Sequence, residues 1–126
     1  DKFDKKVKQE LEQAEQRSSQ ERLDRLAAAN KKADKTTVTS QVYKRNQDVV
    51  AEAKFLAKGI CGLCHTPAPF EKTSGEPFLE VHHWIPLVEG GEDTLENAVA
   101  LCPNCHRRAH SGKDKDCISK HRKLQE

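Results

Sequence analysis

Residues 80–110 read EVHHWIPLVEGGEDTLENAVALCPNCHRRAH, and the architecture follows from this stretch. An apolar-alternating segment at 78–82 predicts a strand, and the proline and glycines of 86–91 predict a long turn. A short apolar run at 98–101 predicts a second strand, and Pro103 suits the first turn of a helix over 103–111. Strand, turn, strand and helix predict a small α+β unit, with one histidine pair on its first strand and another on its helix.

Two C-x-x-C pairs lie on either side of the first histidine pair: Cys61 with Cys64, and Cys102 with Cys105. Four thiolates suit a tetrahedral zinc ion, and a four-cysteine site leaves no open coordination position. We therefore predict a structural zinc that ties a helix expected over 46–58 to the helix at 103–111. Buried reduced cysteines, or a disulfide, are the alternatives. Cys117 is expected to be spare.

The histidines predict a second metal site beside a catalytic base. His106 and His110 are four residues apart, so they project from one helix face and can share an ion. His82 would complete a three-histidine set that leaves positions for water and phosphate oxygens. His83 points to the opposite face of a strand, so it is the predicted general base. Asn97 is expected to fix the loop or to orient the His83 ring. Trp84 and Ile85 are expected to be core residues rather than base-stacking groups.

A metal and a base together predict cleavage of a phosphodiester bond. The charges agree with this: residues 61–101 hold one Lys/Arg against seven Asp/Glu, while residues 102–126 hold seven against three, which suits a cation site beside a phosphate-binding flank. Arg107, Arg108 and Lys113 are candidate DNA contacts, although a solvated basic tail would look the same. A non-catalytic zinc module that binds nucleic acid is the other hypothesis; it would need the cysteines but not the histidines together.

Residues 1–35 contain neither Gly nor Pro and have a thin apolar stripe at helical spacing, which predicts a long helix. We assign residues 1–40 to a helical linker or partner-pairing segment and residues 41–126 to a nuclease domain. Asn46 is the expected N-cap of the next helix, which Gly59 is expected to end.

The composition predicts a cytoplasmic protein with no membrane segment. No apolar run approaches the roughly 20 residues that span a bilayer, and no signal-peptide pattern opens the chain. Hydrophobic residues make up 35% and charged residues 33% of the sequence. So polar a small domain is expected to depend on metal for stability, and a reducing compartment favours metal over disulfides.

The stretches CGLC, EVHHWIPL and GGEDTLENAVALCPNCHRRAH resemble an HNH endonuclease of the ββα-metal (His-Me finger) class. More closely, the sequence resembles the zinc-stapled HNH domain of McrA-like, modification-dependent restriction enzymes. The resemblance implies a ββα-metal catalytic motif with a four-cysteine zinc staple, here preceded by the long N-terminal helix.

The resemblance also implies roles for individual residues. His83 matches the family's general base, Asn97 its central asparagine, and His106 a metal ligand of the final helix. His82 and His110 match the other metal ligands. The catalytic ion would be Mg²⁺, Mn²⁺, Ni²⁺ or Zn²⁺, and the products would carry 5′-phosphate and 3′-hydroxyl ends.

DNA is the implied partner. A McrA-like protein would read modified DNA through a separate domain, expected upstream of residue 1 in the parent chain. The absence of methionine, including at the start, suggests that the sequence is a fragment of such a chain. One site of this class cuts one strand, so double-strand cleavage implies a homodimer or two events. A nicking nuclease in recombination or phage packaging is a further alternative.

Overall fold

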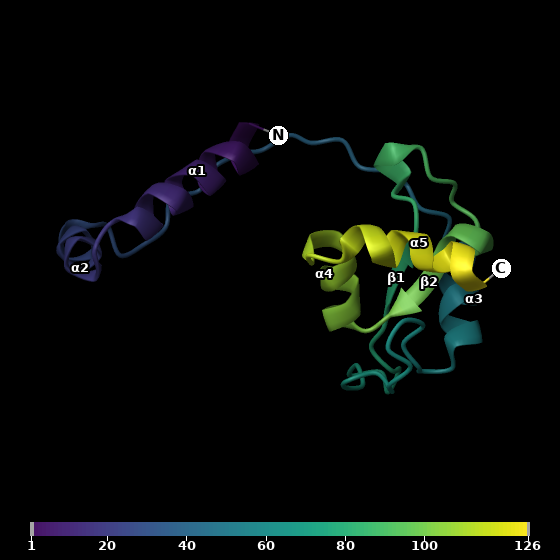
Figure 1. Ribbon diagram of the computed structural model, residues 1–126. Helices are drawn as coiled ribbons and strands as arrows, with labels where there is room; N and C mark the ends of the chain where they lie inside the picture. Colours follow the sequence, from purple (N-terminus) through teal and green to yellow (C-terminus); the bar gives the residue numbers. More distant parts are fainter. Residues whose placement is uncertain (1, 126) are drawn as a thin grey trace. The chain divides into compact units, whose positions relative to one another are not determined.

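The computed structural model describes the backbone of residues 2–125 and the side chains of residues 2–120 (Figure 1). The chain forms two compact units, Asp1–Val42 and Tyr43–Glu126. None of the helices within residues 2–125 is long and apolar enough to cross a membrane.

The first unit contains two helices, α1 (Lys2–Gln16) and α2 (Ser19–Ala28). A long N-terminal helix is thus present, but it is shorter than the predicted span of 1–35. The break has a local cause, because the Ser18 hydroxyl accepts a hydrogen bond from the Glu21 amide at 3.1 Å and so starts a new helix. No residue of either helix is buried.

The second unit begins with helix α3 (Gln47–Ala57), and its predicted N-cap is confirmed. The Asn46 side chain accepts from the Asp48 amide at 2.9 Å. The helix ends where Lys58 and Gly59 adopt positive φ angles of 52° and 78°. Its last turn leads directly into the first cysteine pair, so α3 brings that pair to the hairpin that follows.

Strands β1 (Glu80–His83) and β2 (Ala98–Leu101) form an antiparallel hairpin. Its register pairs Glu80 with Leu101 and His83 with Ala98. The second strand lies where the sequence predicted it. The first begins two residues later than predicted: the Phe78 amide donates to the Phe70 carbonyl at 2.9 Å rather than to β2, and the two rings stack at 4.7 Å between centroids. The connecting loop contains two short 3₁₀ turns, η1 (Leu87–Glu89) and η2 (Leu95–Asn97).

Helices α4 (Pro103–Ser111) and α5 (Lys115–Gln125) complete the unit. Pro103 occupies the first turn of α4, and the Gly112 amide donates to the Arg108 carbonyl at 2.7 Å where that helix ends. Helix α3 packs against β2, while α4 contacts both strands and α5 (Figure 1). The hairpin therefore lies between elements that come before and after it in the chain.

The core is small and includes the cysteine cluster. Trp84 is buried in it, as the sequence predicted. Ile85 was also predicted to be a core residue, which is wrong: its side chain is 47% exposed. Its backbone N–H and carbonyl both bond to the Asn97 side chain, so the backbone faces inward. The buried residues of the cluster are Cys61, Leu79, Trp84, Ala100, Leu101, Cys102, Cys105, Ala109 and Ile118.

We predict that Gly91→Ala destabilises the hairpin loop. A Cβ at Gly91 would lie 1.8 Å from the Ile85 carbonyl oxygen, so the backbone would have to move. The expected loss is about 1–3 kcal/mol in the free energy of unfolding, measured by urea denaturation of the zinc-loaded domain. Gly75→Ala is the control: its Cβ would meet nothing within 4 Å, and it tests only the positive φ of 88°. Equal losses in the two variants would contradict the steric argument.

Candidate metal centres and active site

The four cysteines of the two pairs come together at one place. Their ligand atoms all lie within 4.8 Å of one another. Cys61 and Cys64 lie just after α3, whereas Cys102 and Cys105 lie where β2 passes into α4. Backbone amides donate to two of the sulfurs at 3.4 Å, Leu63 to Cys61 and Cys105 to Cys102, as in a metal-binding knuckle.

The protonation chemistry of this cluster suits a cation. Hydrogen bonds from Thr66 lower the pKa of the Cys64 thiol to about 6, and the two side chains lie 2.9 Å apart. Burial raises the pKa of Cys102 and of Cys105. These buried thiols therefore need a bound cation to ionise, and four thiolates in a closed cluster fit a structural zinc. All five cysteines are free, which excludes a disulfide in this structure.

The predicted histidine ligands also meet. His82 comes from β1, and His106 and His110 come from α4; their ligand atoms lie within 4.8 Å of one another. The Nε2 atoms of His106 and His110 are 3.1 Å apart. Nitrogen ligands lie about 2.0–2.1 Å from a zinc-like ion, so two neighbouring ligands on one ion are separated by roughly 3.0–3.4 Å. The measured separation fits that arrangement.

Two further observations fit a divalent metal at this cluster. The Nδ1 atom of His82 is buried and has no hydrogen-bond partner within the described residues. Burial, with a smaller effect of the neighbouring histidines, lowers the pKa of His82 to about 4, and burial also lowers that of His110. Neutral imidazole is the form that binds metal. The Glu80 carboxylate lies 3.2 Å from His106 Nδ1 and can hold that ring with Nε2 free for an ion.

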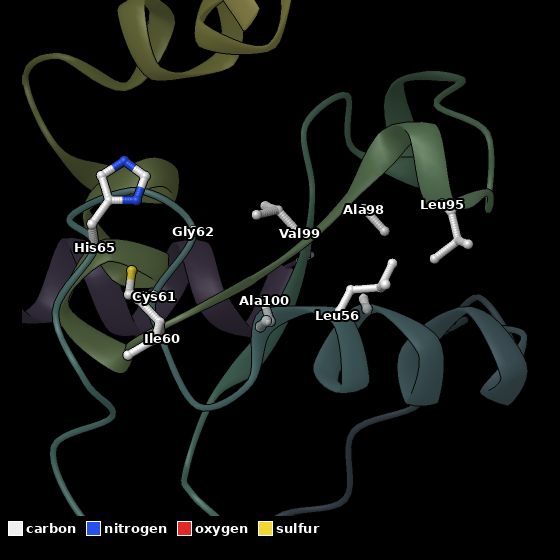
Figure 2. Close-up of a pocket in the computed structure, with 11 residues that line it drawn as sticks. Leu56, Ile60, Cys61, Gly62, His65, Leu95, Ala98, Val99 and Ala100 are labelled. Atoms are coloured by element: carbon white, nitrogen blue, oxygen red, sulfur yellow. The ribbon is translucent and has the colours of Figure 1, made fainter.

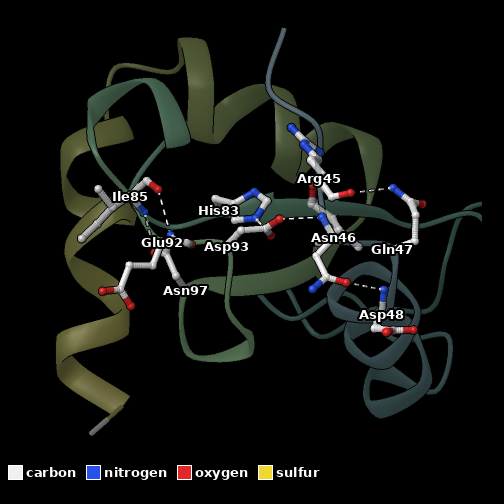
Figure 3. Close-up of polar contacts among 10 residues, drawn as sticks. Arg45, Asn46, Gln47, Asp48, His83, Ile85, Glu92, Asp93 and Asn97 are labelled. Carbon is white, nitrogen blue, oxygen red and sulfur yellow. Dashed lines mark hydrogen bonds and ion pairs between the residues drawn. The ribbon is translucent and has the colours of Figure 1, made fainter.

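His83 is separated from these ligands by the alternation of the strand. Its ring is buried, and its Nε2 lies 2.9 Å from an oxygen of Asp93 (Figure 3). Its Nδ1 is also buried, with no hydrogen-bond partner within the described residues. Sequence reasoning missed Asp93, because an acidic residue in an acidic loop gives no local signal of a partner ten positions away.

Asn97 is 2% exposed and holds the loop between the strands. Its amide donates to the Ile85 carbonyl at 2.9 Å and to the Glu92 carbonyl at 2.7 Å, and its oxygen accepts from the Ile85 amide at 2.9 Å (Figure 3). These bonds correspond to the first of the two roles considered for it, that of fixing the loop.

The candidate DNA-binding residues have different surroundings. Arg107 lines a pocket of about 570 Å³ together with Glu80, Pro103, His106 and His110, so it lies beside the histidine cluster. Arg108 forms an ion pair with Asp114. Lys113 is exposed.

Arg45 is a residue that the sequence did not single out. Its guanidinium donates to the Val81 carbonyl at 3.3 Å, and its charge contributes to lowering the pKa of His82, His110 and Asp93. It lies just before α3, outside the recognisable motifs, so only the folded chain reveals that it is near the site.

A second pocket, of about 350 Å³, lies between α3 and β2 (Figure 2). Its lining is mostly apolar and includes none of the four histidines of the candidate active site. Its lining residues are Ala53, Leu56, Ala57, Ile60, Cys61, Gly62, His65, Leu95, Ala98, Val99 and Ala100.

Comparison with known proteins identifies the class of this domain. Residues 61–112 match the family model described as HNH endonuclease. That segment contains both cysteine pairs and all the candidate catalytic histidines. Residues 61–112 therefore form an HNH-type region with the ββα-metal motif, within an α+β unit whose four-cysteine cluster lies beside that motif.

Individual relatives make the relationship more specific. The chain is 53% identical over 74 residues to the type IV methyl-directed restriction enzyme EcoKMcrA of Escherichia coli (strain K12), across 59% of this chain and 27% of the relative. It is 48% identical over 31 residues to anaredoxin of Nostoc sp. (strain PCC 7120), across 25% of this chain and 41% of that protein. The chain thus spans about a quarter of the length of the restriction enzyme.

A solved structure supports the same relationship to restriction enzymes. The type IV phosphorothioation-dependent restriction endonuclease ScoMcrA matches with a TM-score of 0.56 and 28% identity, over 62% of this chain and 15% of that one. The HNH domain described here is therefore related to those of McrA-type restriction enzymes, as the sequence motifs predicted.

We predict that Cys105→Ser abolishes zinc binding, because a hydroxyl replaces one of four thiolates in a closed site. Atomic absorption should find about one zinc per chain in the parent and far less in the variant, with a lower thermal midpoint. Cys117→Ser is the matched control, since Cys117 is exposed and outside the cluster. Full zinc occupancy in Cys105→Ser, or zinc loss in Cys117→Ser, would show that the cluster is assigned wrongly.

We predict that a second divalent ion binds the histidine cluster. Titration of the zinc-loaded domain with Mn²⁺, followed by calorimetry, should show one site that His106→Ala removes. Glu80→Gln should weaken it about 10-fold, because the carboxylate orients the His106 ring. The control is His65→Asn, which alters an exposed histidine at a positive φ of 59° that asparagine tolerates. Unchanged Mn²⁺ affinity in His106→Ala would refute the site.

Proposed function

We propose that this domain is a metal-dependent DNA endonuclease that hydrolyses phosphodiester bonds and leaves 5′-phosphate and 3′-hydroxyl ends. One observation carries the proposal: adjacent residues of β1 face different partners. His82 lies with His106 and His110 in a cluster with metal-ligand spacing, while His83 is held apart beside Asp93. The match of residues 61–112 to the HNH endonuclease family model supports the same chemistry.

The residues have distinct tasks in this mechanism. His82, His106 and His110 would hold a divalent ion, Mg²⁺, Mn²⁺, Ni²⁺ or Zn²⁺, and the bound ion would supply Lewis-acid stabilisation of the scissile phosphate and of the leaving oxygen. His83 takes the proton of the attacking water at its Nδ1 atom, since its Nε2 atom is engaged by Asp93. Water must reach this Nδ1 atom for the step to occur, because the atom is buried in the structure.

Two other side chains support this chemistry. Asn97 keeps the loop in place by bonding its backbone at Ile85 and Glu92. Arg107 lines the pocket beside the histidine cluster and can bind a phosphate oxygen of the DNA there. Lys113 would contact the DNA backbone at longer range. Arg108 would do so only after leaving its partner Asp114.

The wider function is that of the cleavage domain of a cytoplasmic, modification-dependent restriction enzyme. The similarity to EcoKMcrA and ScoMcrA supports this proposal, and so does the small share of each that the chain spans. Recognition of the modified DNA would belong to a domain upstream in the parent chain, with residues 1–40 as linker or partner-pairing segment. One site nicks one strand, so a double-strand break would need a homodimer or a second event.

We predict that the domain nicks supercoiled plasmid in Mg²⁺, Mn²⁺ or Ni²⁺, and that His83→Ala reduces the rate by about 10²–10⁴-fold, the usual contribution of a general base. Conversion of supercoiled to open-circular DNA on a gel measures this. His65→Asn is the control and should nick like the parent. Absence of nicking in all three metals, or equal rates for parent and His83→Ala, would reject the proposal and leave a zinc-containing nucleic-acid-binding module.

A further inference from the structure

We propose that Asp93 is a positioning residue that sets the tautomer of His83, and that Asn46, the N-cap residue of α3, holds Asp93 in place through its backbone amide. This inference rests on the proposed role of His83 as general base. It assigns a function to a loop carboxylate, and it makes a segment outside the family match part of the active site.

The contacts on the Asp93 carboxylate use both of its oxygens. Oδ1 lies 2.9 Å from His83 Nε2, and Oδ2 accepts from the Asn46 backbone N–H at 2.6 Å (Figure 3). Both bonds lower the pKa of Asp93, the Asn46 amide more strongly, so the group is ionised at neutral pH. An ionised carboxylate only accepts hydrogen bonds. His83 must therefore donate at Nε2.

The other ring nitrogen is then fixed by elimination. A neutral imidazole carries one proton, so donation at Nε2 leaves the lone pair on Nδ1. Nδ1 is the nitrogen that has no hydrogen-bond partner within the described residues. The nitrogen that Asp93 leaves basic is thus the one that no described group occupies, and it can take a proton once water reaches it.

The loop that presents Asp93 is itself anchored. Asn97 donates to the carbonyl of Glu92, the residue immediately before Asp93, at 2.7 Å. The side chain of Asn97 therefore acts on His83 through the loop backbone and Asp93. Two elements distant in sequence therefore position Asp93: the N-cap of α3 bonds its carboxylate, and the turn before β2 holds the backbone next to it.

The substitution Asp93→Asn tests this chemistry because an amide has nearly the same shape but one acceptor and one donor. If its oxygen accepts from the Asn46 amide, its NH₂ faces His83 Nε2 and forces the Nδ1–H tautomer, which cannot accept a proton from water. If its oxygen instead faces His83, its NH₂ opposes the Asn46 N–H. The amide cannot satisfy both donors.

The first measurement is kinetic. Asp93→Asn should lower kcat for plasmid nicking by about 10²-fold, close to the loss of a general base, while KM changes by less than about twofold, since ground-state DNA binding is unaffected. Zinc content should match the parent, and the thermal midpoint should fall only slightly, since the variant loses one charge-assisted hydrogen bond. An unchanged kcat, or a loss confined to KM, would overturn the proposal.

The second measurement is a rescue. Asn46→Pro removes the competing N–H, and the φ of −73° at Asn46 is one that proline adopts. The double variant Asn46→Pro/Asp93→Asn should therefore recover about 10-fold of the lost kcat, because the amide oxygen is free to accept from His83. Asn46→Ala/Asp93→Asn is the matched control: it also loses the cap onto Asp48 but retains the N–H, and it should recover nothing. Equal activities in the two double variants would contradict the model.

The third measurement does not depend on cleavage. Nitrogen-15 NMR of the histidine rings, without DNA, should show His83 as the Nε2–H tautomer in the parent and a shift toward Nδ1–H in Asp93→Asn. An Nδ1–H tautomer in the parent, or no change in the variant, would overturn the positioning role. Failure of the parent to nick DNA would reject the proposed function instead, and the NMR result would still decide whether Asp93 sets the tautomer.

Discussion

The second unit of this chain depends on the contact between two C-x-x-C pairs that lie 37 residues apart. Cys61 and Cys64 follow α3 directly, while Cys102 and Cys105 connect β2 to α4, so the cluster joins the elements before and after the hairpin. The buried core is small and three of the four cysteines belong to it. The sulfurs of the four cysteines lie within 4.8 Å of one another, so a single zinc ion could join them and turn this contact into a stable junction.

In the folded hairpin, the alternation of side chains along β1 separates the candidate metal ligand from the candidate base. His82 and His83 are neighbours in sequence, yet the first lies beside the helical histidines and the second beside Asp93. A metal ligand and a base can therefore come from consecutive residues without competing for the same ion. On α4, by contrast, helical spacing brings two histidines together, since the Nε2 atoms of His106 and His110 lie 3.1 Å apart.

The loop between the strands is fixed mainly by contacts to its backbone groups. Asn97 bonds three backbone groups at Ile85 and Glu92, and Gly91 passes so close to the Ile85 carbonyl that a side chain would not fit. These constraints place Asp93 between His83 and the start of α3. Through Asp93, the loop thus connects the start of α3 to the candidate base His83.

The sequence by itself determined what depends on local spacing. It predicted the cysteine pairs, the histidines one turn apart, the cap at Asn46, the second strand and the family, because i,i+4 geometry, strand alternation and knuckle spacing are properties of short segments. It overextended the N-terminal helix, where the cap at Ser18 was overlooked, and it placed Ile85 in the core. Only the tertiary structure decided that Asp93 and Arg45 lie beside the histidines. Their positions are set by a long loop and by the packing of α3 on the hairpin, and such long-range contacts leave no periodic signal in the residues themselves.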